Sequence, residues 1–232
     1  MECIILAGGL GTRLKGVIGA VPKCMAPVLD KPFLGYVLQW LEQQQCSRVV
    51  LSLGHLHEVI LQWLPTQHFN MTIDYVIETE PLGTGGGIQL AMQQCKSAHV
   101  AVLNGDTMFQ VSMDSLMAFH TQNKAMTTLA LKEMTAFERY GVVKTNDKQV
   151  ITAFEEKKFM EVGTINGGVY IIDRQQFNNL NLPKKFSFEK DYLEAIVGTG
   201  QFYGMVQEGY FIDIGIPEDY AKVQVDFKTI FE

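Results

Sequence analysis

The chain has 232 residues, of which 47% are hydrophobic and 19% charged, a composition typical of one large globular domain with a substantial core. Its formal net charge of -6 excludes a general nucleic-acid binder, which needs a basic face, although a local pocket can still attract a small anion. The four cysteines form no Cys-x-x-Cys pair, so they indicate neither a disulfide framework nor a zinc site and suit a reducing compartment.

The first predicted element is a buried strand over residues 4–7, which leads directly into a glycine-rich loop, GGLGTR, at residues 8–13. Glycines let backbone N–H groups approach an anion closely, and successive N–H groups in a tight turn form a concave anion site. Arg13 and Lys23 would add positive charge, the first as a planar fork and the second as a point charge. Together these features predict phosphate binding, with a nucleoside triphosphate as the simplest ligand. The alternative is that the glycines only satisfy turn geometry.

The loop matches neither of the two commoner phosphate-binding motifs. A P-loop needs Gly-x-x-x-x-Gly-Lys-Ser/Thr, and the chain contains no such string. A dinucleotide fingerprint needs Gly-x-Gly-x-x-Gly, and Leu14 stands where its third glycine belongs. We therefore expect a phosphate loop of another type.

Strand and helix patterns alternate through the rest of the first half. Apolar residues recur at helical spacing between Phe33 and Leu41, after Pro32, and again between Val59 and Leu64. A further helix is predicted from about residue 87 to 94, and buried strands are predicted at 49–53, 73–77 and 98–103. Such alternation, with continuous apolar strands, predicts a mostly parallel sheet flanked by helices.

The second half is richer in strand patterns, which lie at residues 127–131, 141–145, 150–155, 164–172 and 202–206. We expect an α/β fold, namely a Rossmann-like, mostly parallel mixed sheet flanked by helices, with an antiparallel extension that carries the second substrate. No linker or repeat divides the chain. It should form a single domain over 1–232, in which residues 1–110 mainly bind the nucleotide and residues 111–232 mainly bind the second substrate.

Asp106 follows the predicted strand 98–103, in the string Asn104-Gly105-Asp106. Ligands of open α/β sheets bind outside the carboxyl ends of the strands, and the glycine loop falls at another such end. The loop and Asp106 should therefore face one site. The alternative is an acidic turn residue, because Asn-Gly-Asp is also a common turn sequence.

Nine strings, in order along the chain, resemble the sugar-1-phosphate nucleotidyltransferases, also called nucleotide-sugar pyrophosphorylases: LAGGLGTRL, PKCMAPV, KPFL, PLGTGGGI, LNGDT, RYGVV, FEEK, INGGVYI and FIDIGIPEDY. The resemblance implies the nucleotide-diphospho-sugar transferase fold and Mg²⁺-dependent transfer of a nucleoside monophosphate to a sugar 1-phosphate, with release of pyrophosphate. Residues 15–21, 186–191 and 211–220 further resemble the D-glycero-D-manno-heptose 1-phosphate guanylyltransferases. That likeness implies GTP and a heptose 1-phosphate as substrates and GDP-heptose as product.

The resemblance also assigns roles around the nucleotide. It implies catalytic roles for Arg13, on the β- and γ-phosphates, and for Lys23, near the α-phosphate, with Asp106 and Asp213 as Mg²⁺ ligands. The implied nucleotide-binding residues are Leu6, Gly8, Gly9, Gly11, Thr12, Arg13, Pro81, Leu82, Gly83, Thr84 and Gly105. Simpler alternatives are a solvated lysine at position 23, a plain helix-opening turn at 81–87, and an aspartate at 213 that favours the helix opened by Pro217.

The resemblance places the sugar phosphate against Gly141, Glu156, Lys157 and Asn166. The alternative for the charged string at 155–158 is a solvated surface run. Two positions depart from the family pattern: Lys158 stands where proline is usual, and Gly167 where alanine is usual. We expect these changes to widen or loosen the sugar site.

Two other functions remain open from the sequence. One is uridylyl or cytidylyl transfer to a different sugar 1-phosphate, and the other is a non-catalytic nucleotide-sugar-binding regulatory subunit. The presence of both cations and both aspartates argues against the second. No segment has the ~20 apolar residues of a membrane helix, and the apolar start is too short for a signal peptide. We expect a cytoplasmic protein with small-molecule substrates and no nucleic-acid or membrane partner, and a homo-oligomer remains open.

Overall fold

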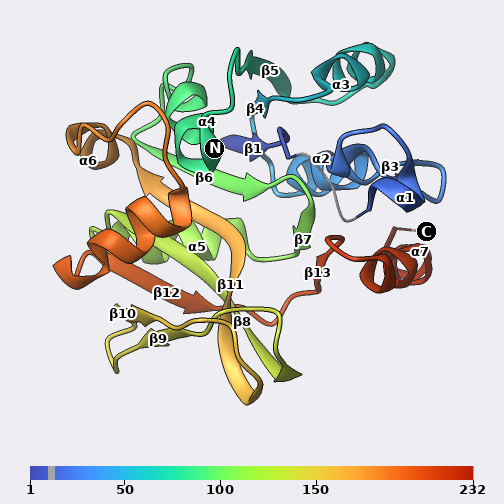
Figure 1. The fold of residues 1–232 in the computed structure, drawn as a ribbon. Coiled ribbons are helices and arrows are strands. Elements are labelled where there is room, and N and C mark those ends of the chain that lie inside the picture. The colour runs from blue at the N-terminus through green and yellow to red at the C-terminus, as the bar shows by residue number, and fades with distance from the viewer. Residues whose placement is uncertain (10–13, 232) are drawn as a thin grey trace.

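A seven-stranded sheet runs through the molecule in a computed structural model that describes residues 1–9 and 14–231 (Figure 1). The strand order is β12-β8-β11-β6-β1-β4-β5. The pairs β6–β1, β1–β4, β4–β5 and β8–β12 are parallel, whereas β11 is antiparallel to both of its neighbours. The strands are β1 (Glu2–Leu6), β4 (Arg48–Leu53), β5 (Thr72–Ile77), β6 (His99–Asn104), β8 (Thr127–Phe137), β11 (Met160–Asp173) and β12 (Phe202–Val206).

Three two-stranded ladders stand beside this sheet. They are β2 (Pro27–Val28) with β3 (Lys31–Pro32), β7 (Thr107–Phe109) with β13 (Phe211–Asp213), and β9 (Val143–Thr145) with β10 (Ile151–Phe154). The α-helices are α1 (Lys15–Ile18), α2 (Phe33–Gln43), α3 (His57–Trp63), α4 (Gly83–Met92), α5 (Met113–Gln122), α6 (Arg174–Asn179) and α7 (Pro217–Phe231). Shorter helical segments are η1 (Lys23–Met25), η2 (Leu64–Thr66), η3 (Phe188–Glu194) and η4 (Val197–Thr199).

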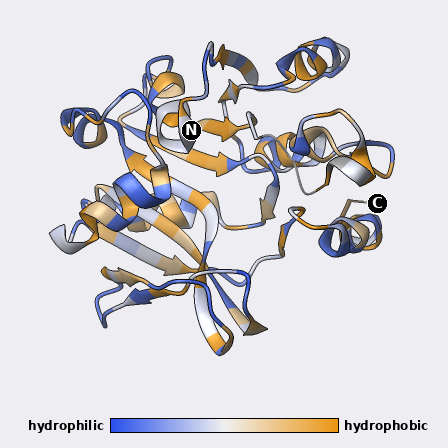
Figure 2. Cartoon of the chain, in the orientation of Figure 1, coloured by the Kyte–Doolittle hydropathy of each residue, from blue (hydrophilic) through white to orange (hydrophobic). Residues whose placement is uncertain are grey.

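The sheet separates two apolar cores because successive side chains of a strand point to opposite faces. In β1, Cys3 and Ile5 belong to one core and Ile4 to the other. Helices α2, α5 and α7 supply the first core, whereas α4, α6 and η3 supply the second. Figure 2 shows the matching hydrophobic colouring of the inner strands. Burial on both faces explains why these strands are continuous apolar runs in the sequence.

The expected fold class is confirmed, with differences at the element ends. The helix predicted from about residue 87 begins at Gly83, and the strand predicted over 164–172 is the middle of the longer β11. The strand predicted over 141–145 begins at Val143, and helix α5 was not predicted. Among the described helices, none combines the length and the apolar character needed to cross a membrane.

The chain order creates a crevice beside β1. From β1 the chain proceeds to β4 and β5 on one side of the sheet, and it then returns to β6 on the other side of β1. In open α/β sheets, ligands bind outside the carboxyl ends of the strands at such a reversal of strand order. The residues that follow β1 and β6 are therefore the place to look for a site.

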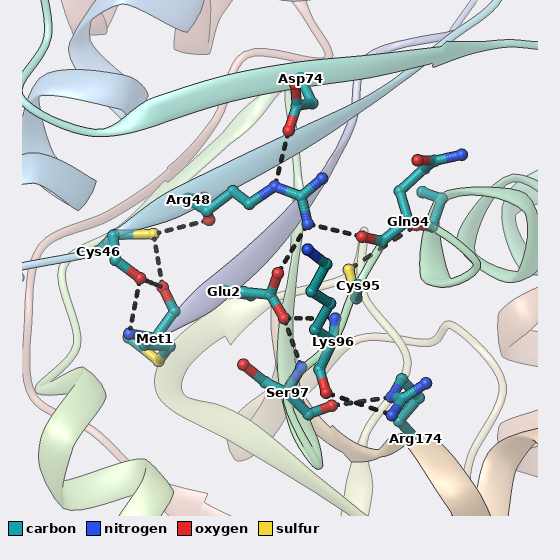
Figure 3. Close-up of polar contacts among 12 residues, drawn as sticks. Met1, Glu2, Cys46, Arg48, Asp74, Gln94, Cys95, Lys96, Ser97 and Arg174 are labelled. Atoms are coloured by element: carbon teal, nitrogen blue, oxygen red, sulfur yellow. Dashed lines mark hydrogen bonds and ion pairs between the residues drawn. The ribbon is translucent and has the colours of Figure 1, made fainter.

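At the opposite, amino-terminal edge of the sheet, Arg48 lies between two carboxylates (Figure 3). Its Nη1 donates to Glu2 at 2.8 Å and its Nε donates to Asp74 at 2.7 Å. The second oxygen of Glu2 accepts the N–H groups of Lys96 and Ser97 at 2.7 and 2.5 Å. Burial alone would raise the pKa of Glu2, but these hydrogen bonds and Arg48 together lower it to about 2.

Candidate active site at the carboxyl edge of the sheet

Lys23 lies between Asp106 and Asp213. Its Nζ is 2.6 Å from Oδ2 of Asp106 and 3.0 Å from Oδ1 of Asp213. The lysine side chain is only 14% exposed, so the alternative of a solvated surface lysine is wrong. Burial alone would lower the pKa of Lys23, but the two aspartates raise it above its ordinary value, so the ammonium stays charged.

Short backbone contacts bring the two aspartates together. The N–H of Gly105 donates to the carbonyl of Leu6 at 2.9 Å, which holds the end of β6 against the end of β1. The next residues form β7, which pairs with β13 so that Thr107 faces Asp213. Asp213 is therefore part of a strand that ends before helix α7 begins, and its carboxylate bonds Lys23 instead of serving the start of that helix.

Gly215 was not among the predicted site residues, yet it lies against this cluster. A Cβ at this position would stand 3.1 Å from Nζ of Lys23 and 3.0 Å from Oδ1 of Asp213. Any larger residue would therefore force the Lys23 ammonium or the Asp213 carboxylate to move. The signal in the sequence was its place two residues after Asp213.

The phosphate loop is described in part. Gly8 packs closely on the strand end at Gly54, where a Cβ would be 3.1 Å from the Gly54 nitrogen. At the exposed Gly9, none of the described residues comes within 4 Å of a Cβ. Gly105 is buried and its N–H is engaged by Leu6. The predicted residues Gly11, Thr12 and Arg13 lie outside the described residues.

The predicted base segment, residues 81–84, runs into the first turn of α4 and is packed against Phe186. Gly83 has a φ of +76°, and a Cβ there would be 2.5 Å from the carbonyl oxygen of Phe186. Phe186 in turn donates its N–H to Leu82 and accepts from Gly85, both at 3.0 Å. Pro81 and Thr84 are exposed beside this contact. The glycines of this segment thus allow close packing on Phe186, in addition to the nucleotide binding predicted for them.

A cavity of about 700 Å³ opens beside the lysine–aspartate cluster and shares Asp213 and Gly215 with it. All four residues predicted to contact the sugar phosphate line this cavity: Gly141, Glu156, Lys157 and Asn166. The cavity and the charged cluster therefore form one continuous site, made from both halves of the chain. The structure thus brings the predicted sugar-phosphate residues together with Asp213, whereas residues 81–84 do not line this cavity.

The four charged residues at 155–158 differ in whether they form ion pairs. Glu155 pairs with Lys158 at 3.0 Å and with Lys144 at 3.8 Å, as in an ordinary surface run. Glu156 and Lys157 line the cavity, as Glu155 does, but neither of them has an ion-pair partner among residues 1–9 and 14–231. They keep their charge available to a ligand.

The expected widening of the site at Gly167 is wrong. A Cβ there would lie 2.3 Å from the ring of Phe109, so that ring already fills the space of a methyl group. Phe109 is buried and packs edge-to-face on Phe211. Lys158, the other departure from the family pattern, is exposed and does not line the cavity.

Several cavity-lining residues carried no role in the sequence analysis, among them Arg139, Glu189 and Lys190. Arg139 donates to Asp219 at 2.5 Å and to the hydroxyl of Tyr140 at 2.8 Å, which fixes one wall. Glu189 and Lys190, which also line the cavity, belong to η3. Each lies inside or beside a string that carried the family resemblance, and that position was the available signal.

Comparison with known proteins gives a consistent result. A family model described as nucleotidyl transferase matches residues 2–229. The chain is 47% identical over 228 residues to the D-glycero-alpha-D-manno-heptose 1-phosphate guanylyltransferase of Aneurinibacillus thermoaerophilus, covering 98% of this chain and 99% of that protein. It is 42% identical over 220 residues to the protein of the same name from Campylobacter jejuni, covering 95% and 97%.

Solved structures give a similar match. HddC from Yersinia pseudotuberculosis superposes with a TM-score of 0.89 at 37% identity, covering 97% of this chain and 99% of that one. The same protein complexed with GMP-PN gives a TM-score of 0.88 at 36% identity. The similarity spans the whole site described above.

Proposed function

The chain belongs to the nucleotidyl transferase family, and from this premise we propose that it transfers the guanylyl group of GTP to D-glycero-α-D-manno-heptose 1-phosphate. The products are GDP-heptose and pyrophosphate. The observation that carries the chemistry is the continuity of the Lys23–Asp106–Asp213 cluster with the cavity. The names of the two full-length relatives support the choice of base and sugar.

The reaction makes one phosphorus–oxygen bond and breaks another. An oxygen of the sugar 1-phosphate attacks the α-phosphorus of GTP, and the bond from that phosphorus to the β-phosphate oxygen breaks. The nucleophile is already ionised at neutral pH, so no general base is needed. Because both reactants are anionic, the protein must screen their repulsion, align them and stabilise charge on the leaving pyrophosphate.

Asp106 and Asp213 fit a divalent cation. Their carboxylates already converge on one positive charge, and Oδ2 of Asp213 has no hydrogen-bond partner within the part of the chain that the structure describes. Oxygen ligands of this kind are the ones Mg²⁺ prefers, with phosphates and water completing its shell. We assign the Mg²⁺ site to these two residues, and the ion, when bound, would neutralise phosphate charge.

Lys23 would contact the α-phosphate, because its ammonium lies between Asp106 and Asp213, and Asp213 lines the cavity. Arg13, outside the described residues, would hold the β- and γ-phosphates beside the backbone N–H groups of Gly9 and Gly11. The remaining nucleotide contacts are proposed for Leu6, Gly8, Thr12, residues 81–84 and Gly105.

In the cavity, Lys157 would hold the sugar phosphate and Glu156 would accept hydrogen bonds from sugar hydroxyls, with Gly141 and Asn166 beside them. The amide of Asn166 already donates to Tyr170 at 2.9 Å and accepts from Gly168 at 3.0 Å, which fixes its orientation. Residues 1–110 would thus mainly bind the nucleotide, and residues 111–232 the sugar phosphate. A GTP-consuming reaction and buried free thiols support a cytoplasmic location.

The test is pyrophosphate release with Mg²⁺ across GTP, UTP, CTP, ATP and dTTP, each against α- and β-heptose 1-phosphate and mannose 1-phosphate. We expect release with GTP and the α-heptose phosphate. Release only with another pair would keep the mechanism and correct the substrates. If folded protein binds nucleotide but releases no pyrophosphate with any pair, the result would instead indicate a regulatory, nucleotide-sugar-binding role.

A further inference from the structure

A carboxylate on the cavity wall is held by the segment predicted to bind the base. Oε2 of Glu189 accepts the hydroxyl of Thr84 at 2.7 Å and the hydroxyl of Ser187 at 3.1 Å. The Thr84 hydroxyl also accepts the N–H of Phe188 at 2.9 Å. These contacts join the first turn of α4 to the first turn of η3, which are 105 residues apart in sequence. The Glu189 side chain is therefore fixed from two sides.

The second oxygen of Glu189 is free. Glu189 lines the cavity and is half-buried, yet Oε1 has no hydrogen-bond partner among the residues that the structure describes. An ionised carboxylate accepts hydrogen bonds strongly, and one whose rotamer is already held loses little entropy on binding. The open oxygen is thus a preorganised acceptor at the cavity wall.

The start of η3 does not need Glu189 as a cap. Ser187 already accepts the N–H of Lys190 at 3.2 Å through its hydroxyl, and Asp191 accepts the N–H of Ser187 at 2.7 Å. This reciprocal arrangement satisfies the orphan donors of a helix start. Helix capping therefore does not account for a glutamate that turns toward the cavity.

We propose that Glu189 is a further sugar-recognition residue, whose free oxygen accepts a hydrogen bond from a hydroxyl of the sugar 1-phosphate. This deepens the proposed function and rests on it. The same carboxylate is hydrogen-bonded to Thr84 in the proposed base segment. The residues proposed to contact the nucleotide and the sugar phosphate are therefore joined by a direct hydrogen bond. Two glutamates would then accept hydrogen bonds from the sugar: Glu156, in the loop that follows β10, and Glu189, in η3.

The test compares Glu189→Ala and the isosteric Glu189→Gln with wild type. The matched control is Glu161→Gln, which makes the same change of charge at an exposed position outside the cavity. Losing a hydrogen bond to a charged acceptor should raise KM and Kd for α-heptose 1-phosphate ~10–100-fold in Glu189→Ala. Glu189→Gln, which keeps an oxygen for Thr84, should show a smaller rise of the same kind. In Glu189→Gln, which keeps the bond to Thr84, KM for GTP should stay within about twofold, a split that general damage to the fold would not give.

Pyrophosphate release gives KM, and calorimetric titration with α-heptose 1-phosphate gives Kd without turnover. An active wild type with unchanged sugar affinity in both Glu189 variants would overturn the inference and leave the proposed function standing. A wild type that binds the sugar phosphate but releases no pyrophosphate would overturn the proposed function, and weaker binding by the variants would still support the inference. A wild type that neither binds the sugar phosphate nor turns over would overturn both.

Discussion

Each end of the central sheet carries one cation between two carboxylates, and the two clusters differ in what surrounds them. At the amino edge, Arg48 stands between Glu2 and Asp74. At the carboxyl edge, Lys23 stands between Asp106 and Asp213. The distances are similar, so the ion pairs alone do not tell a structural cluster from a functional one.

The difference lies in what adjoins each cluster, because Asp213 lines a cavity and Asp74 does not. At the amino edge, Glu2 also accepts two backbone N–H groups, and Arg48 also donates to the carbonyl of Gln94 at 2.6 Å. At the carboxyl edge, Asp213 keeps an oxygen without a partner among the described residues and lines a cavity of about 700 Å³. A cluster away from any cavity stabilises the fold, whereas one with an open acceptor beside a cavity can bind a ligand.

The largest effect on turnover should come from Asp106→Asn. Loss of one carboxylate charge should lower kcat for Mg²⁺-dependent pyrophosphate release by at least ~10²–10³-fold, because the charge on the phosphates is no longer balanced. The matched control is Asp74→Asn, the same substitution in the Arg48 cluster outside the cavity, which should keep wild-type turnover. Near-normal turnover in a folded Asp106→Asn protein would remove Asp106 from the mechanism.

Lys23→Ala should lower kcat by roughly 10²-fold, the usual result of removing one preorganised electrostatic contact. It should also increase the affinity of the nucleotide-free protein for Mg²⁺, because Asp106 and Asp213 lose the cation that they share. Turnover and calorimetric Mg²⁺ titration check the two effects. Unchanged turnover would exclude the catalytic role of Lys23.

A smaller loss is expected from Gly215→Ala. The added methyl would stand 3.0–3.1 Å from Asp213 Oδ1 and Lys23 Nζ, so both groups must shift by a few tenths of an ångström. A displacement of this size should lower kcat about 10-fold with little change in thermal stability. Gly198→Ala, where nothing lies within 4 Å of the new methyl, serves as the control. Equal kcat values for the two variants would contradict the assignment of Gly215 to the site.

No effect on turnover is expected from Glu2→Gln, but the pH dependence of stability should change. In the wild type, the lowered pKa of Glu2 contributes stability that is fully present above its ordinary value of 4.5 and is lost as the pH falls toward about 2. The shift corresponds to about 3 kcal/mol. Urea unfolding between pH 2 and pH 6 should show this loss in wild type and not in Glu2→Gln. Parallel curves for the two proteins would show that Glu2 is not the titrating group.

Much of the fold followed from local patterns. Buried parallel strands are continuous apolar runs, so β1, β4, β5 and β6 were predicted to within two residues at their ends. The start of α4 was missed because four of its first five residues are glycine, and glycine disfavours helix. There the packing of Phe186 against the glycines outweighs local propensity.

The positions of the candidate site residues could be predicted better than the contacts between them. The strand-end rule placed Asp106 correctly, but the ion pairs of Lys23 span 83 and 190 residues of sequence. They depend on the three-residue pairing of β7 with β13, which no local pattern indicates. The same holds for Glu189, whose contact with Thr84 exists only when η3 packs on α4.

The β7–β13 ladder also determines when the Lys23–Asp106–Asp213 cluster can form while the chain is being synthesised. Asp213 leaves the ribosome well after Asp106, with about a hundred residues between them, a delay of about 5–20 s at ordinary elongation rates. Until β13 is made, the growing chain holds the glycine loop, Lys23 and only one of the two carboxylates. A chain that ends before β13 therefore lacks Asp213 and cannot form this centre.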